Sequence, residues 1–184
     1  NPDDPNDTAL LEMIDGHIGN LARALRTNNS ERAAFEAAWM AHAITDGLTP
    51  AHHFPLEQAM AELRGGEGLE TRTSILKKNL MKGDNGIELI KNNWKFWGAK
   101  GMMTTHVAFE AGVASVVAYP RFKDAIPSDD DILQVKNHGY REYYLNQVHA
   151  VASMKMYDNF SKSGWTTDLA WQTNHELMPI IIKS

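Results

Sequence analysis

The sequence has no cysteine among its 184 residues. Disulfide bonds and thiolate metal sites are therefore excluded, and a zinc ion could be held only by His, Asp and Glu side chains. Long apolar runs are missing too, since the longest, residues 111–118, is far shorter than the roughly 20 residues that span a bilayer. Positive charge is not in excess, because the net charge is −5. No basic field favours nucleic acid, and we expect no stable nucleic-acid complex.

The sequence also lacks strand-type alternation and repeats of fixed period. Apolar residues recur instead at helical spacing, as in Leu10, Ile14 and Ile18. Hydrophobic residues make up 43% of the chain and charged residues 22%, which is typical of a globular protein. We predict an all-α fold, a single domain over residues 1–184 with about seven or eight helices. Because the chain opens with Asn1 and not with Met, we expect a further segment upstream.

Helix ends follow from capping residues, Gly and Pro. The first predicted helix is capped by Asp7 or Thr8 and runs to about residue 26. The others are predicted over 30–47, 55–64, 69–82, 87–97, 102–119, 129–137, 140–161 and from 167 onward. Ser30 is expected to cap the second helix, and Gly47 to end it in a left-handed conformation before Pro50. Pro179 is expected to interrupt the last helix. In the helix over 69–82, the side chains expected to face inward are Leu69, Ile75, Leu76 and Leu80.

The first chemical motif is His42 with Asp46, which are four residues apart and so share one helix face. Phe35, Ala38 and Trp39 precede them on that face, and a helix normally turns such a stripe toward the core. A neutral His and a carboxylate that face inward are costly unless something satisfies them. A metal ion is one group that would do so.

The second motif is His106 with Glu110, again four residues apart on an apolar face. A corner at Pro50 delivers a further histidine, His52, shortly after the first motif. A catalytic zinc commonly has three protein ligands and one open position for water. His52, His106 and Glu110 would make such a set.

Two other features have both an ordinary and a functional interpretation. The aromatic residues of the helix over 87–97, Trp94, Phe96 and Trp97, could line a lipid or ligand pocket, but we favour core packing because large aromatics are usually buried. His17 could bind a metal, but we favour a histidine at the edge of the core that is bonded to a carbonyl.

The pattern His42-x₃-Asp46-x₃-Pro50-x-His52, followed by His106-x₃-Glu110, resembles the zinc-ligand pattern of the bacterial phospholipase C and S1–P1 nuclease superfamily. The match covers the intervals within each motif as well as the residue types. Members of that superfamily are all-α phosphodiesterases that hold three zinc ions in a cleft, and they are typically exported.

The resemblance implies a role for each of the five residues. His42 would bind one zinc of a closely spaced pair, and Asp46 would bridge that pair at the catalytic centre. His52, His106 and Glu110 would hold the separate zinc. His53 is the weaker candidate beside His52, because the interval from Pro50 selects His52. The expected reaction is attack on phosphorus by a metal-activated water in a phosphodiester or phospholipid substrate, and the expected location is periplasmic or extracellular.

The sequence departs from the superfamily pattern in two ways. The remaining zinc ligands of the family precede the first motif and include an N-terminal Trp, whereas this sequence begins with Asn1. The segment between His52 and His106, residues 54–101, is also longer than usual and could cover the cleft or bind a partner. Three interpretations stay open: a zinc phosphodiesterase, a helical zinc-binding protein that has lost catalysis, and buried His–acid pairs in an ordinary helical domain.

Overall fold

The computed structural model describes residues 8–122 and 125–184, and within these ranges the chain forms helices and loops without a strand. The all-α prediction is confirmed. The helices in chain order are α1 (Ala9–Arg26), α2 (Ser30–Gly47), η1 (Pro50–His53), α3 (Leu56–Leu63), η2 (Leu69–Thr71), α4 (Ile75–Asn79), α5 (Gly86–Trp97), α6 (Met102–Val117), α7 (Asp129–His138), α8 (Tyr140–Ser153), α9 (Met156–Ser163), α10 (Thr167–Gln172), η4 (Thr173–Leu177) and α11 (Met178–Lys183). In the described part of the chain, no helix is both long and apolar enough to cross a membrane.

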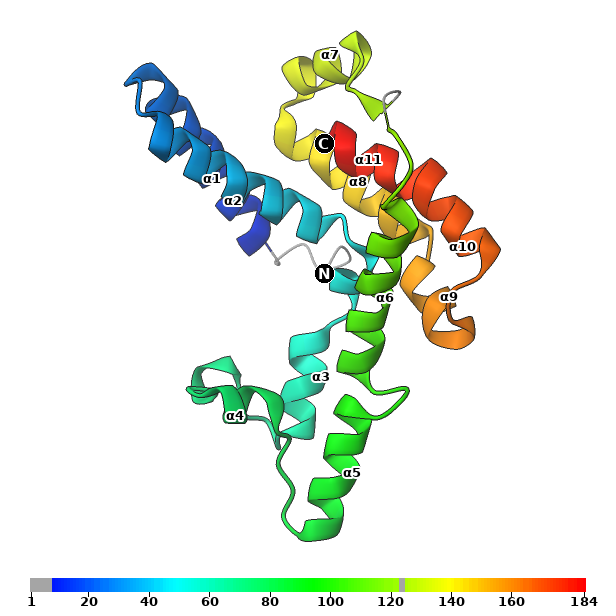
Figure 1. Cartoon of the computed structure of the whole chain (residues 1–184). Helices are drawn as coiled ribbons and strands as arrows, with labels where there is room; N and C mark the ends of the chain where they lie inside the picture. The colour runs from blue at the N-terminus through cyan, green and yellow to red at the C-terminus, as the bar shows by residue number, and fades with distance from the viewer. Residues whose placement is uncertain (1–7, 123–124) are drawn as a thin grey trace.

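α1 and α2 pack against each other as an antiparallel hairpin (Figure 1). Asn28 turns the chain with a positive φ of 53°, a conformation that Asn tolerates. Asn29 then caps α2, because its side chain accepts a hydrogen bond from the backbone N–H of Arg32 at 3.0 Å. The cap predicted at Ser30 is therefore wrong by one residue. At the start of α1, Thr8 makes no cap bond, and the alternative cap Asp7 lies outside the described residues.

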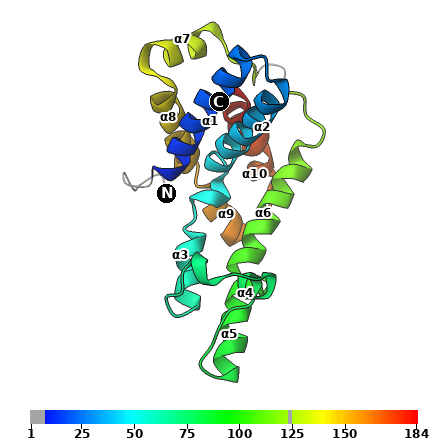
Figure 2. The same cartoon turned by 90° about the vertical axis from the view of Figure 1, so that its left-hand side faces the viewer.

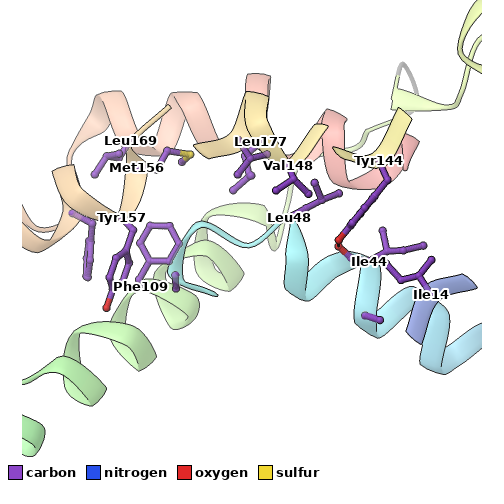
Figure 3. Packing of buried hydrophobic residues seen from close by; sticks show 14 residues of the cluster. Ile14, Ile44, Leu48, Phe109, Tyr144, Val148, Met156, Tyr157, Leu169 and Leu177 are labelled. Carbon is purple, nitrogen blue, oxygen red and sulfur yellow. The ribbon is translucent and has the colours of Figure 1, made fainter. Parts of the chain in front are cut away.

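The main core lies where the α1–α2 hairpin meets α6, α8, α9 and the C-terminal helices. Its most deeply buried large side chains are Ile14, Leu48, Phe109, Tyr144, Val151, Met156 and Leu177. The Tyr144 hydroxyl reaches α2 (Figure 3), where it donates a hydrogen bond to the carbonyl of Ile44 at 3.1 Å. Phe109 of α6 packs edge-on against Tyr157 and Phe160 of α9. These contacts hold α6 in a fixed position against α9.

Residues 56–97, which contain α3, α4 and α5, form a lobe that projects from the rest of the molecule (Figure 1 and Figure 2). The lobe has a small core of its own, made of Met60, Met81 and Phe96. This core is a separate cluster from the main core, and Met102 and Met103 at the start of α6 pack against it.

The helix predicted over 69–82 is wrong, since only η2 and the short α4 are helical there. Side chains take over the backbone groups that a helix would have paired. The Arg64 guanidinium donates to the carbonyls of Lys77 and Leu80 at 2.8 Å each. Asn93 bonds both the N–H and the carbonyl of Met81 at 3.0 Å. As a result the chain leaves the helical path after α4, and the side chains of Ile75, Leu76 and Leu80 are exposed instead of facing inward.

The prediction that the aromatic helix is core is also wrong for most of α5. Only Phe96 is buried, whereas Ile87, Ile90 and Trp94 are 81%, 71% and 70% exposed. These three residues lie at helical spacing on the side of α5 away from Phe96. The helix therefore carries two apolar faces, and the small core around Met60, Met81 and Phe96 covers only one of them.

Two further differences concern the C-terminal half. The helix predicted over 140–161 is divided into α8 and α9, because Lys155 adopts a left-handed φ of 51°. The helix that contains Pro179 is not interrupted, since α10, η4 and α11 follow one another directly. Proline cannot donate a hydrogen bond to the carbonyl four residues before it, and the π-helical turn η4 just ahead of it accommodates that loss.

Candidate metal centre

The corner predicted after α2 is present and places His52. Leu48 is fully buried, the Thr49 hydroxyl donates to the carbonyl of Thr45 at 2.7 Å, and Pro50 begins the 3-10 turn η1. The backbone N–H of His52 donates to the carbonyl of Thr49 at 2.9 Å. η1 contacts α6, so the histidine at this turn is brought to the helix that carries the second motif.

Three side chains converge at this place. The distance from His52 Nε2 to Glu110 Oε1 is 2.9 Å, and that from His106 Nε2 to the same oxygen is 3.1 Å. The two imidazole rings lie 5.1 Å apart between centroids. The potential ligand atoms of these three residues all lie within 4.8 Å of one another, and no other such group of three occurs among the described residues.

The two contacts to Glu110 are close to the spacing of neighbouring ligands around a tetrahedral metal ion, and the nitrogens of the two imidazoles lie within 4.8 Å of each other. Zinc–ligand distances of about 2.0–2.1 Å place neighbouring ligand atoms roughly 3.3 Å apart. A small outward shift of the Glu110 carboxylate would open the observed 2.9 and 3.1 Å contacts to that value. The side chains of His52 and Glu110 are 34% and 42% exposed, which leaves one side of the group accessible to a fourth ligand. The group therefore fits an open, three-ligand site.

Burial favours the form of His106 that binds metals. Desolvation lowers the pKa of the His106 imidazole, and the nearby His52 lowers it further, while the charge of Glu110 opposes this shift. A neutral imidazole is the form that binds a metal ion. His106 Nδ1 is buried and makes no hydrogen bond within the described structure, so no outer partner fixes its orientation. In many metal sites such a partner is present.

Tyr157 of α9 lies beside the group of three, and the sequence did not indicate this neighbour. Its ring lies edge-on to the His106 ring, with centroids 6.4 Å apart. Burial raises the pKa of the Tyr157 phenol, and the charge of Glu110 adds to that shift. The phenol therefore stays protonated near neutral pH. The sequence signal was only an apolar-face tyrosine in a helix, which is the ordinary pattern of a core residue.

His42 and Asp46 lie outside the group of three. His42 Nε2 is 3.3 Å from Asp46 Oδ2, and the two side chains are 63% and 34% exposed. The charge of Asp46 acts on the pKa of His106, so this carboxylate lies near the candidate centre. The structure brings no third ligand-type side chain to the pair within the described residues. Their place in a zinc pair stays a prediction.

The prediction of which face of α2 points inward is wrong. Phe35, Trp39 and His42 are exposed. The buried residues of α2 are instead Ala33, Glu36, Ala43, Ile44 and Gly47. The helix is rotated because Glu36, a polar residue at helical spacing within that small-residue stripe, binds partners from its own helix and from α1.

Glu36 is the hydrogen-bond partner of His17, whereas we expected His17 to bond to a carbonyl. His17 Nδ1 donates to Glu36 Oε2 at 2.5 Å, and Arg32 forms an ion pair with the other carboxylate oxygen. The His17 ring is stacked parallel to Trp39. The carbonyl prediction is wrong, although His17 does lie at the edge of the core. The signal in the sequence was a charged residue within the small-residue stripe of α2.

The preference for His52 over His53 agrees with the geometry. His53 Nε2 donates to the carbonyl of Gly47 at 2.8 Å, so this ring is turned toward the end of α2. Gly47 itself does not adopt the predicted left-handed conformation, because it is the last residue of α2 and has no positive φ. A Cβ at this position would lie 2.0 Å from the Tyr144 hydroxyl. Close packing, and not backbone freedom, is the reason for glycine here.

No family model, no curated protein and no solved structure matches the chain. The resemblance to the zinc phospholipases and nucleases therefore depends on the five motif residues alone.

Proposed function

We propose that the protein is a zinc-dependent phosphodiester hydrolase related to the bacterial phospholipases C, with His52, His106 and Glu110 as ligands of one zinc ion. The observation that supports this most is the convergence of Nε2 of both histidines on one Glu110 oxygen, from segments 54 residues apart in sequence. His138 and Glu142 have the same spacing as His106 and Glu110, yet they form only an exposed pair 3.9 Å apart. The third side chain distinguishes the candidate centre from such a pair.

The residues of this chain would divide the work at the centre as follows. The two imidazoles hold the ion through Nε2, and Glu110 contributes the negative charge that partly balances it. A zinc ion there would lower the pKa of an attacking water and neutralise phosphate oxygens. Tyr157 shields one side of the histidines from solvent and, as a neutral phenol, is a hydrogen-bond donor. Asp46 lies close enough for its charge to act on the same site.

Metal content is the direct test. The purified protein is loaded with zinc, dialysed and analysed for bound metal, next to the variants Glu110→Gln and Glu142→Gln. Loss of an outer partner weakens metal affinity about 10–100-fold, and loss of a ligand should weaken it more. Glu110→Gln should therefore lose the metal, whereas Glu142→Gln, which removes the matched exposed pair, should keep it. Equal metal content in the two variants would refute the ligand assignment.

Hydrolysis is measured on the same samples with a chromogenic phosphodiester and a chromogenic phosphocholine ester. We expect turnover that a chelator abolishes and that added zinc restores. A second function is favoured by the position of His42 and Asp46 outside the group: a helical zinc-binding protein with one ion and no catalysis. Bound zinc without turnover would select that alternative. If no zinc binds, the remaining interpretation is that the His–acid pairs only stabilise the fold.

A further inference from the structure

The exposed face of the lobe has an unusual composition for a surface. Eight large apolar side chains between residues 75 and 97 are exposed: Ile75, Leu76, Leu80, Ile87, Leu89, Ile90, Trp94 and Trp97. The core of the same lobe has only three fully buried members. Large apolar side chains that gather in this number on an exposed surface mark an interaction site more often than an ordinary surface.

This face is held in a defined shape. Trp97 Nε1 donates to the carbonyl of Asn79 at 2.6 Å, which ties α5 to the end of α4. Asn92 donates to the carbonyl of Lys82 at 2.7 Å and to that of Leu63 at 3.3 Å, which ties α5 to both neighbouring segments. Phe96 fills the core behind α5. The outer side chains are thus exposed although Phe96 on the other side of the helix is fully buried.

The lobe as a whole is nearly neutral, with seven Lys and Arg against six Asp and Glu, but the segment that carries the exposed apolar side chains is basic, and this charge selects the kind of partner. Residues 74–100 contain six lysines and only two acidic residues, whereas the rest of the chain contains 12 Lys and Arg against 21 Asp and Glu. Lys91 and Lys95 lie on α5 beside the stripe formed by Ile87, Ile90 and Trp94. A second copy of the chain would bring two lysine-rich faces together, which like-charge repulsion opposes. The charge favours an anionic partner.

The shape and the residue types favour a lipid surface over a protein groove. The lobe projects from the body, so its outer face can meet a flat surface without interference from the other helices (Figure 2). Amphipathic helices that carry Trp, Ile and Leu with flanking Lys lie in the plane of the bilayer interface.

We propose that the lobe docks on a bilayer surface that contains anionic phospholipids, with α5 lying on the interface. Ile87, Ile90 and Trp94 enter the boundary between headgroups and acyl chains, and the lysines pair with lipid phosphates. The lobe connects η1 to α6, so the docking segment lies between the two segments that carry the proposed ligands. The docking itself needs neither bound zinc nor catalysis, and it stands or falls separately from the proposed function.

The experiment is co-flotation of the whole chain with vesicles of phosphatidylcholine alone or mixed with phosphatidylglycerol, with a chelator present. We expect at least about tenfold stronger partitioning to the mixed vesicles, weakened by added salt. The double variant Ile90→Ser with Trp94→Ser should lose at least about tenfold of that partitioning. The matched control, Leu25→Ser with Tyr119→Ser, removes two apolar side chains that are 62% and 90% exposed outside the lobe, and it should bind as the parent does.

Circular dichroism and thermal melting establish that both double variants are folded before they are compared. Equal partitioning of the lobe variant and its control would overturn the proposal, as would failure of the parent protein to bind the mixed vesicles. Sedimentation of the protein without lipid gives a further outcome. A dimer that the lobe variant abolishes, found together with no vesicle binding, would assign the face to a second copy and refute the lipid surface.

Discussion

At the scale of single residues, Glu36 shows how one buried charge sets the orientation of a helix. Its side chain is 0% exposed, and it is partnered by His17 from α1 and Arg32 from its own helix. A buried carboxylate is tolerated only when such partners satisfy it. These bonds explain why Phe35 and Trp39 face solvent, although apolar character alone would turn them inward. The hydrogen bond from His17, aided by Arg32, lowers the pKa of the Glu36 carboxyl.

This pKa shift predicts how stability depends on pH. Because the folded pKa of Glu36 lies below the unfolded value, the carboxylate stabilises the fold fully above the unfolded pKa, and this contribution is lost as the pH falls through the folded pKa. Glu36→Gln should melt at a lower temperature than the parent at about pH 7, and the difference should shrink as the pH falls below the ordinary glutamate pKa of about 4.3 and through the lower folded pKa. Glu31→Gln, an exposed residue in the first turn of the same helix, is the control and should change little. A gap that persists unchanged at low pH would contradict this role.

At the scale of elements, the junction between α2 and η1 depends on a close approach at Gly47. A Cβ there would lie 2.0 Å from the Tyr144 hydroxyl and 2.5 Å from Leu10 Cδ2. Tyr144 cannot move aside freely, since its hydroxyl is bonded to Ile44 and its ring is stacked on Tyr140. Gly47→Ala should therefore destabilise the protein by about 1–3 kcal/mol, the usual cost of overpacking a core.

The control for this substitution is Gly16→Ala in the middle of α1. Nothing lies within 4 Å of a Cβ at Gly16, which is exposed. Alanine is the better helix former there, so stability should rise by roughly 0.5–1 kcal/mol. Chemical denaturation midpoints of the two variants measure both effects. If both substitutions destabilise the protein, the stability lost in Gly47→Ala does not come from the specific contact with Tyr144.

Sequence reasoning was accurate for elements whose signals are local. The all-α class, the bounds of α1 and α2, and the corner at Pro50 follow from helical spacing, caps and a proline, and the structure has them. The convergence of His52, His106 and Glu110 was proposed from intervals that resemble a known ligand pattern. Failures occurred where distant side chains replace local bonds. Arg64 and Asn93 hold residues 77–81 in a non-helical path, and no local pattern indicates that.

At the scale of the whole molecule, the candidate centre lies between two separately packed units. η1 leads from the body into the lobe, and α6 leads back from the lobe into the body. The two segments that carry the proposed ligands are therefore the two connections between the lobe and the body. Phe109 of α6 belongs to the main core, one turn from His106, and this anchors the ligand helix to the body. The lobe can therefore loosen without loss of the helix that carries two of the three proposed ligands.

This arrangement predicts different outcomes for two phenylalanine substitutions. Both Phe96 and Phe109 are fully buried, and truncation of such a side chain to alanine costs about 3–5 kcal/mol. In the lobe, whose core has three members, that loss is a large part of the local stability, so Phe96→Ala should raise hydrogen exchange in α3 and α5 and leave α1, α2 and α8 protected. Phe109→Ala should lower the melting temperature of the whole protein, because its ring contacts Tyr157, Phe160 and Trp165 across the main core. Uniform loss of protection in Phe96→Ala would show that the two cores unfold as one unit, and the lobe could not then move on a lipid surface independently of the candidate centre.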